Sequence, residues 1–373
     1  MAGSPTKIAI VGTGYVADLY MPSLRTFPKL QIIGAWDIDA ARLAAFTAHW
    51  AVPAATSLGG LLADAPDIVL NLTNPHAHVA VNRAAIGAGR HVWCEKPLAM
   101  TMVEAEALMV LARQHDVHLA SAPCSALGEA AQTAWMAVRQ GRIGQPRLVY
   151  AELDDDFIPA APYRKWTSAS GALWPAEDEF RTGCTLEHAG YYLSWLMAIF
   201  GPVDRVVSGS ARLLDAAQTG AQHDTPDYAS ASLFFASGMV ARLTCSIVAR
   251  HDHRLRIFGD AGVLEIGDAW ANGAAVRIRR RLTLRRRLVN SPFASRVRLK
   301  GPIHPKIGRH GAASMNFALG VAEMADAIAE GREPKLAGDF ALHLTEVSLA
   351  MQAGGDHAMR TAFAPVAPMD WAL

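Results

Sequence analysis

The sequence predicts an α/β protein with a doubly wound parallel sheet in its first part and an α+β domain with a large, mostly antiparallel sheet in its second. Residues 7–11 form a continuous apolar run that ends in a glycine-rich turn, and strand and helix patterns then alternate up to residue 121. Beyond residue 205, strand patterns follow one another across short turns, which is typical of antiparallel sheets. We therefore expect two domains, at residues 1–122 and 123–373.

Composition narrows the class of protein. The chain has 373 residues, of which 51% are hydrophobic and 18% charged, enough for a sizeable core in each domain. A net charge of +1 does not favour binding to nucleic acid or to an anionic membrane, and no stretch approaches the length of about 18 apolar residues that spans a bilayer. The four cysteines are widely spaced and indicate reduced thiols, and the N-terminus has no export-signal pattern, so we expect a cytoplasmic protein.

The first strand leads into Gly12-x-Gly14-x-x-Ala17. Glycine at the first position allows a tight turn, glycine at the second lets a pyrophosphate approach bare backbone, and a small residue at the third lets the next helix pack on the strand. A second strand, residues 31–36, ends in Asp37, where a carboxylate would meet an adenosine ribose hydroxyl. This combination predicts a dinucleotide site in a Rossmann-type domain.

The rest of the first domain continues the alternation. Thr101-x-x-Glu104 predicts a capping box at the start of a helix, and Pro22 predicts a kink or break in the first helix. The expected helices are residues 15–27, 40–49 and 76–88 and the helix after Thr101, and the remaining strands are residues 67–72, 90–94 and 117–121.

Polar residues gather where two of these strands end. Residues 71–76 follow one strand, and Glu95-Lys96-Pro97 follows the next. Ligands of open α/β sheets bind outside the carboxyl ends of the strands. An ammonium group there can hydrogen-bond a substrate hydroxyl and favour loss of its proton, so Lys96 is the first candidate for chemistry, although a solvated surface lysine is the ordinary alternative.

The second domain begins with a helix at residues 127–140 and a strand at residues 147–153. Residues 154–181 lack periodicity and contain Arg164 and Trp166, which could form part of a sugar-binding wall. A surface loop held down by its own aromatic side chains is an equal alternative. The expected later strands are residues 205–214, 228–236, 239–249, 253–258 and 263–266, and the last helices are residues 312–330 and 340–353.

Two further features are weaker signals. Residues 277–300 carry ten basic side chains; an exposed hairpin or loop is favoured, and a grip on a substrate anion or on an acidic patch of a partner subunit is the alternative. The pairs His76/His78 and His251/His253 lack a third ligand in sight, so we expect loop or turn roles and no metal site.

The first 120 residues resemble the glucose–fructose oxidoreductase/inositol dehydrogenase (Gfo/Idh/MocA) family. The resemblance rests on Val11-Gly12-Thr13-Gly14, Asp37, Thr73-Asn74-Pro75 with His78, and residues 89–97, which include Glu95-Lys96-Pro97. It implies an NAD(P)-dependent oxidoreductase of sugar or cyclitol hydroxyls, with NAD favoured over NADP because Asp37 would repel a 2′-phosphate. It implies cofactor contacts at Gly12, Thr13, Gly14, Tyr15, Val16, Asp37, Thr73, Asn74, His78, Glu95 and Lys96.

The family's second domain supplies a helix with an Asp and, four residues later, a His that accepts the proton. Here Glu187 stands in place of the Asp and Tyr191 in place of the His, so the resemblance leaves the standard mechanism open. Lys96 and an oxidised nicotinamide would lower the pKa of a tyrosine, and a Tyr–Lys pair could then take the hydroxyl proton. We place Tyr191 ahead of His188, which is one residue off that helix face but is a better-matched base.

The predicted function is hydride transfer between NAD and a secondary hydroxyl of a sugar, sugar derivative or cyclitol, with Lys96 and Tyr191 assisting the proton. Lys96, Arg164, Trp166, Glu187 and Tyr191 are the expected substrate contacts. One alternative is a redox-neutral NAD-dependent epimerase or glycosidase-like enzyme, and another is a non-catalytic NAD- or sugar-sensing protein. The resemblance also implies a homodimer or homotetramer that forms through the C-terminal sheet.

Overall fold

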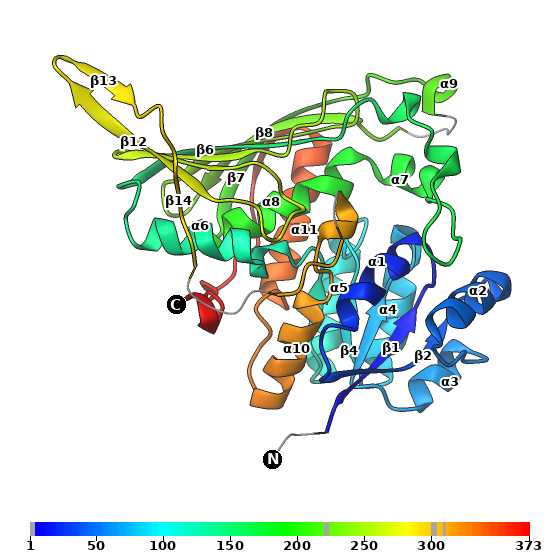
Figure 1. Ribbon diagram of the computed structural model, residues 1–373. Coiled ribbons are helices and arrows are strands. Elements are labelled where there is room, and N and C mark those ends of the chain that lie inside the picture. Colours follow the sequence, from blue (N-terminus) through cyan, green and yellow to red (C-terminus); the bar gives the residue numbers. More distant parts are fainter. Residues whose placement is uncertain (1–3, 220–223, 300–303, 309–310) are drawn as a thin grey trace. The chain divides into compact units, whose positions relative to one another are not determined.

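The computed structural model describes residues 4–219, 224–299, 304–308 and 311–373 (Figure 1). Its internal contacts divide the chain into two compact units. The first unit comprises Met1–Cys124, Ala161–Thr182 and Asn316–Leu349, and the second comprises Ser125–Ala160, Gly183–Met315 and Ala350–Leu373. The predicted domain division at residue 122 stays a prediction. None of the helices in the described ranges has the length and hydropathy that a bilayer span requires.

The first unit contains the predicted parallel sheet. Its five strands run in the order β2-β1-β3-β4-β5, so the direction of winding reverses between β1 and β3. Ligand sites of open α/β sheets lie at such a reversal. The strands are β1 (Thr6–Val11), β2 (Leu30–Trp36), β3 (Ile68–Asn71), β4 (His91–Cys94) and β5 (Leu119–Ser121). The helices between them are α1 (Tyr15–Leu24), α2 (Ala40–Trp50), α3 (Leu58–Ala63), α4 (His78–Gly87) and α5 (Met102–Gln114).

Side-chain caps begin several of these helices. The Asp39 carboxylate accepts the N–H groups of Ala41 and Arg42 at the start of α2, each at 3.0 Å. Thr101 Oγ1 accepts the N–H of Glu104 at 3.3 Å, which confirms the predicted cap of α5. Pro22 does not break α1, which continues to Leu24, because a proline removes one helical donor without preventing its neighbours from bonding.

Two later stretches of the chain pack with the first unit. They carry α7 (Ala176–Thr182), α10 (Leu319–Glu330) and most of α11 (Asp339–Ala353). Gly320 of α10 lies directly against the indole of Trp93 on β4, and the Ala318 N–H is donated to Ser23 Oγ at 3.1 Å. The short helices α3 and α7 were not expected from the sequence pattern.

The second unit is built on a ten-stranded sheet that is antiparallel except where β6 and β9 pair in parallel. Its main path runs β13-β12-β11-β10-β6-β9-β8-β7-β15, with β14 paired to β12. The strands are β6 (Pro146–Asp154), β7 (Val203–Ala211), β8 (Tyr228–Phe235), β9 (Val240–Ser246), β10 (Leu255–Gly259), β11 (Gly262–Ile266), β12 (Arg277–Leu284), β13 (Arg287–Asn290), β14 (Ser295–Arg296) and β15 (Gly355–Ala358). The α/β class and both predicted sheets are confirmed.

Helices cover one side of this sheet. α6 (Glu129–Arg139) and α8 (Cys184–Phe200) lie on the same side (Figure 1), whereas α9 (Ala216–Thr219) is a single turn. Val149, Ala151 and Leu153 alternate along β6 and are fully buried, as period-two strand geometry requires of a covered face. The intervening Tyr150 and Glu152 therefore belong to the other face.

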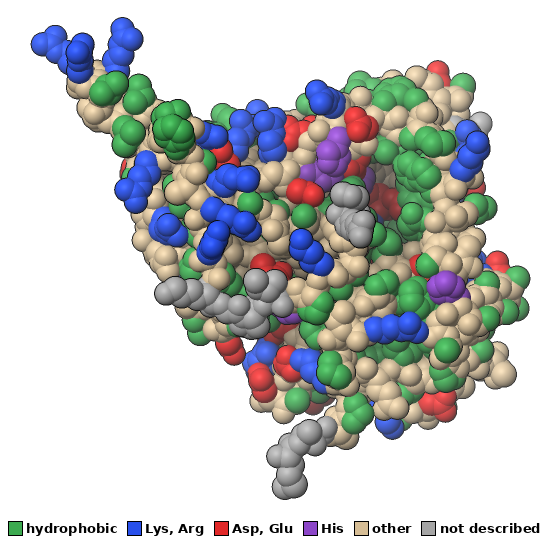
Figure 2. Space-filling view, viewed as in Figure 1, with side chains coloured by type: hydrophobic (Ala, Val, Ile, Leu, Met, Phe, Trp, Pro, Cys, Tyr) green, Lys and Arg blue, Asp and Glu red, His purple; other side chains and the backbone are tan. Residues whose placement is uncertain are grey.

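Residues 277–290 of the basic stretch form the hairpin of β12 and β13, which projects from the rest of the sheet (Figure 1), whereas Lys300 lies outside the described residues. Lys and Arg side chains gather at its tip (Figure 2). Residues 282–290 are all exposed, and Arg285 has a φ of +54° in the turn. The sequence-based preference for an exposed hairpin is confirmed.

Candidate active site

The glycine turn of the first unit has the geometry that its sequence predicts. Gly12 has a φ of +88°, and a Cβ added there would lie 2.7 Å from backbone atoms of Leu72 and Thr73. No other residue fits that position, because β1 and β3 end in backbone-to-backbone contact. Gly14 then precedes the first turn of α1, so the helix begins where the two strands end.

Asp37 lies at the end of β2, beside this turn. Its Oδ2 accepts the Thr13 N–H at 2.7 Å and the Thr13 hydroxyl at 2.9 Å, and its Oδ1 accepts the Asp39 N–H at 2.9 Å. Arg42 Nε lies 3.5 Å from the same Oδ2. Asp37 therefore fixes the glycine turn as well as being the predicted ribose contact; each carboxylate oxygen can accept more than one hydrogen bond, so the two roles are compatible.

The loop after β3 is tied to the loop after β4 through a buried histidine. His78 Nε2 lies 2.9 Å from the Thr73 carbonyl oxygen, and His78 Nδ1 lies 2.7 Å from that of Pro97. Asn71 Oδ1 accepts the Thr73 hydroxyl at 2.7 Å, which holds the first residue of the loop. Two of the predicted strand-end stretches are thus brought together.

Glu95 and Lys96 follow β4 as predicted, and Glu95 is almost fully buried. Glu95 Oε1 accepts the Tyr20 hydroxyl at 2.7 Å, and its Oε2 accepts the Lys96 N–H at 3.0 Å. Burial and the charge of Glu95 raise the pKa of Tyr20 well above its usual value, so the phenol remains the donor. The backbone of Lys96 is consequently held by a buried acid rather than by solvent.

The aperiodic segment of residues 161–182 contacts the glycine-turn end of the first unit. Asp18 of α1 accepts hydrogen bonds from the Ser168 hydroxyl and from the N–H and hydroxyl of Ser170, the latter two at 3.0 and 2.7 Å. Asn74 donates to Asp178 Oδ2 at 3.1 Å. Partial burial and the nearby Glu179 raise the pKa of Tyr15.

Aromatic side chains hold the same segment together. Tyr163 packs edge-on against Trp174 at a centroid distance of 5.6 Å, and Trp166 packs against Trp174 at 5.2 Å. The guanidinium of Arg164 lies 4.9 Å from the Tyr163 ring centroid. Both sequence-based readings, a self-packed loop and a substrate wall, are compatible with this arrangement, so substrate contact by Arg164 and Trp166 stays a prediction.

Glu187, His188 and Tyr191 all lie in the first two turns of α8, in the second unit. Gly183, with a φ of +88°, begins the helix, and a Cβ there would lie 3.0 Å from atoms of Thr225 and Gln352. Glu187 and Tyr191 are 5% and 7% exposed. The Tyr191 ring packs edge-on against Trp270 at 6.2 Å between centroids. The proposed roles of these residues, like that of Lys96 in the first unit, stay predictions.

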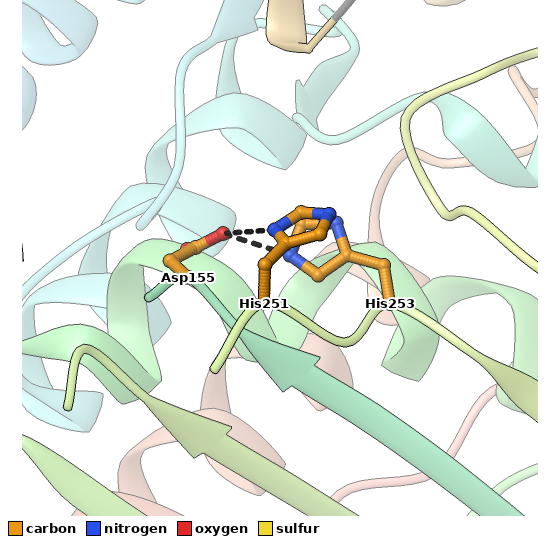
Figure 3. A group of neighbouring side chains, drawn as sticks. All are labelled: Asp155, His251 and His253. Atoms are coloured by element: carbon orange, nitrogen blue, oxygen red, sulfur yellow. Dashed lines mark hydrogen bonds and ion pairs between the residues drawn. The ribbon is translucent and has the colours of Figure 1, made fainter. Parts of the chain in front are cut away.

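His188 belongs to a cluster that the sequence did not reveal. His188 Nε2 lies 2.8 Å from Asp155 Oδ2, and His253 Nε2 lies 2.7 Å from Asp155 Oδ1. Figure 3 shows His251 and His253 turned toward the Asp155 carboxylate. The expectation that the His251/His253 pair has no third ligating group nearby is therefore wrong, because it depended on spacing alone and could not foresee Asp155.

The carboxylate and the imidazoles of this cluster change one another's pKa. Burial alone would raise the pKa of Asp155, but the facing imidazoles of His188 and His253 hold it well below its usual range. Burial alone would lower the pKa of His253, but the carboxylates of Asp155 and Asp268 raise it to about 9. Asp155 is therefore a buried carboxylate surrounded by imidazoles, directly beside the helix that carries the predicted catalytic residues.

Two family models and several known proteins are similar to this chain. Residues 6–122 match the model of an oxidoreductase family with an NAD-binding Rossmann fold, GFO_IDH_MocA, and residues 131–265 match the GFO/IDH/MocA C-terminal domain. Trans-1,2-dihydrobenzene-1,2-diol dehydrogenase of Mus musculus is 25% identical over 269 residues, covering 70% of this chain and 74% of that protein. UDP-N-acetylglucosamine 3-dehydrogenase of Acidithiobacillus ferrooxidans is 28% identical over 253 residues, covering 68% and 71%.

Solved structures share the fold at lower identity. The WlbA dehydrogenase from Bordetella pertussis, solved in complex with NADH and UDP-GlcNAcA, superposes with a TM-score of 0.73 at 18% identity, covering 96% of this chain and 99% of that one. An oxidoreductase from Agrobacterium radiobacter, solved in complex with NAD+, L-tartaric acid and magnesium, gives 0.72 at 16% identity, covering 95% and 98%. The two family models match in chain order and together cover most of the chain: the chain belongs to the Gfo/Idh/MocA family of NAD-binding oxidoreductases.

Proposed function

We propose that this oxidoreductase transfers hydride between NAD and a secondary ring hydroxyl of a sugar, sugar derivative or cyclitol, with Lys96 and Tyr191 assisting proton transfer. The observation that carries the proposal is the Tyr20–Glu95–Lys96 arrangement, which fixes the lysine at the end of β4. The diol and sugar-nucleotide dehydrogenases named above are described by substrates with a hydroxyl on a ring carbon. A cyclic vicinal diol is the chemistry common to this substrate class.

The residues of the first unit fit the cofactor. Gly12 lets β1 and β3 end in close contact, α1 begins after Gly14, and Asp37 lies at the end of the neighbouring strand. These features suit a pyrophosphate and an adenosine ribose. NAD, when bound, supplies the hydride acceptor; everything else in the reaction is proton handling by side chains.

Oxidation removes a hydride from the carbon and a proton from the oxygen of the same alcohol, which leaves a ketone. In our proposal the Lys96 ammonium hydrogen-bonds the hydroxyl oxygen and stabilises negative charge that develops there. The Tyr191 phenolate takes the proton, and Glu187, on the same face of α8, binds a second hydroxyl. A phenol serves as a base near neutral pH only beside positive charge, so the mechanism requires Lys96 and Tyr191 to act together.

One contact favours a second proton acceptor for the same reaction. His188 Nε2 lies 2.8 Å from the buried Asp155 carboxylate, an arrangement that orients the imidazole. His188 therefore remains the alternative to Tyr191.

The test measures formation of reduced nicotinamide with NAD or NADP and a panel of sugars, sugar acids, cyclitols and cyclic diols. Lys96→Met and Tyr191→Phe are each expected to lower kcat by about 100-fold or more, and His188→Gln by less. Lys29→Met, which removes a surface lysine paired with Asp326, is the matched control and should keep full activity. Full turnover by Lys96→Met would overturn the mechanism, and a larger loss in His188→Gln than in Tyr191→Phe would transfer the base to His188.

If no substrate reduces free NAD, the protein-bound cofactor should be extracted and its redox state measured. Retained NAD that cycles without net consumption would support the redox-neutral alternative instead.

We also propose a homodimer or homotetramer through the uncovered sheet face, where Arg242 and Arg256 contact the nearly buried Glu152. Light scattering after size-exclusion chromatography tests the assembly, and Arg242→Ala should weaken it.

A further inference from the structure

Three side chains of the second unit converge on one point; Asp155, His251 and His253 are called the Asp155 cluster here. The Asp154 and Asp252 backbones form an isolated antiparallel bridge, with Asp154 N–H donated to the Asp252 carbonyl at 3.1 Å and Asp252 N–H to the Asp154 carbonyl at 2.9 Å. Because side chains alternate along paired strands, the residue after Asp154 and the residues on both sides of Asp252 share a face. The bridge therefore brings together one carboxylate and two imidazoles.

The ligating atoms of the Asp155 cluster lie close enough to share one ion. His253 Nε2 is 2.7 Å and His251 Nδ1 is 4.0 Å from Asp155 Oδ1, and all three ligand atoms fall within 4.8 Å of one another. Zinc ligands at about 2.0–2.2 Å from the ion stand about 3–3.5 Å apart. Lengthening the first of these distances and shortening the second, each by roughly half an ångström, would give that spacing.

Burial divides the cluster into a closed and an open side. The side chains of Asp155 and His253 are 6% and 0% exposed, whereas that of His251 is 48% exposed. Figure 3 shows both imidazoles approaching the carboxylate from the same stretch of loop. Such a site keeps coordination positions free for water or another oxygen ligand, as catalytic metal sites do.

We propose that the Asp155 cluster binds one divalent first-row transition-metal ion through Asp155 Oδ1, His251 Nδ1 and His253 Nε2. This inference does not depend on the proposed function. Two imidazoles with one carboxylate suit zinc, cobalt or iron(II), whereas magnesium and calcium prefer sites made of oxygen alone.

Buried atoms around the cluster support the assignment. The other oxygen of Asp155 and the other ring nitrogen of His253 are buried and face polar side chains. His188 Nε2, 2.8 Å from Asp155 Oδ2, and Asp268 Oδ1, 3.9 Å from His253 Nδ1, stand where outer partners of metal ligands stand.

The experiment uses the full chain without a histidine tag, stripped with a chelator and then dialysed against zinc or cobalt(II). Metal analysis should find one tightly bound ion per chain, and cobalt(II) should give the visible absorption bands of a protein-bound ion. His251→Gln is the main variant because this side chain is half exposed and its loss should leave folding intact. It should weaken zinc binding at least about tenfold.

His304→Gln is the matched control, because His304 Nδ1 lies 2.8 Å from Glu129 in a pair outside the Asp155 cluster. Zinc binding should be unchanged in that variant, and His253→Asn should abolish it in protein whose thermal unfolding remains cooperative. The proposal is overturned if the stripped wild-type chain binds no zinc or cobalt(II) above the level of His251→Gln, or if His304→Gln loses binding to the same extent.

Discussion

Tyr20 and Glu95 form a 2.7 Å hydrogen bond inside the first unit, and the other oxygen of the same carboxylate accepts the N–H of Lys96. Tyr20 is fully buried and also accepts a 2.9 Å hydrogen bond from Trp93 Nε1. An interior phenol on α1 thus determines the position of a buried acid, and the acid determines the backbone of the lysine. This connects the helix that follows the glycine turn with the residue proposed to touch the substrate.

Tyr20→Phe should destabilise the protein by about 1–3 kcal/mol, because Glu95 and Trp93 each lose a buried partner. It should also lower kcat more than it raises KM, since Lys96 is displaced rather than removed. Thermal unfolding and steady-state kinetics provide the two readouts. Tyr228→Phe, at a half-buried strand position, gives the baseline for losing a hydroxyl; equal effects of the two variants would show that the Tyr20 contact is unimportant.

Asp37→Ser should shift cofactor preference toward NADP. The change removes the carboxylate that would repel a 2′-phosphate. Arg42 Nε, which lies 3.5 Å from Asp37 Oδ2 in the unchanged protein, is then able to attract that phosphate. The ratio of NADPH to NADH affinity, measured by fluorescence titration, should rise about tenfold or more. Adding Arg42→Ala to Asp37→Ser should remove most of that gain; a ratio unaffected by Arg42 would show that the guanidinium does not reach the ribose.

Gly320→Ala should destabilise the first unit by about 1–3 kcal/mol, because a Cβ at this position would lie 1.9 Å from the Trp93 ring and tightly packed interiors yield little. Gly87→Ala is the matched control at the end of α4, where a Cβ would meet nothing within 4 Å. Chemical denaturation measures both. Comparable stability of the two variants would mean that α10 can move away from β4 at little cost.

His91 should contribute to acid sensitivity. Burial, with a smaller effect of His118, lowers the pKa of His91 from 6.5 to about 4, and its Nδ1 accepts the His118 N–H at 2.9 Å. Since the folded pKa is the lower one, the unfolded chain binds this proton more readily. The resulting stability is complete above pH 6.5 and is lost as the pH falls toward 4.

The expected contribution is about 1–2 kcal/mol after allowance for the partial exposure of His91. His91→Asn keeps an acceptor near Nδ1 but carries no titratable group, so its stability should fall less between those two pH values. Denaturant titrations of both proteins across this range measure the difference. Parallel curves for wild type and variant would assign the acid sensitivity to other groups.

The sequence predicted what depends on neighbours along the chain. Glycine in the turn at Gly12, Asp37 at the end of a strand and the Thr101 cap are local patterns with one favoured structure. β15 was missed because residues 355–358 carry no strand pattern, and they form a strand only by pairing with β7. α7 was missed because its seven residues are too few for a clear period, and α3 has six.

In the candidate site, too, sequence patterns identified the local motifs and missed the long-range contacts. Lys96 and α8 were identified from motifs, but the Asp155 cluster depends on a backbone bridge between residues 154 and 252, which no local pattern could signal. The hydrogen bonds of Asp18 to Ser168 and Ser170 are of the same kind, since they join segments separated by about 150 residues. Long-range pairing of polar side chains therefore accounts for most of what sequence reasoning did not find.

The first unit is assembled from three separate stretches of the chain, which determines when it can be completed during synthesis. The chain passes between the two units at residues 124/125, 160/161, 182/183, 315/316 and 349/350. The glycine-turn end of the chain leaves the ribosome first, yet the helix that covers Trp93 is synthesised almost 200 residues after the second unit begins. The first unit is thus begun early and completed late: until α10 is synthesised, Trp93 on β4 lacks the backbone of Gly320 that covers its ring.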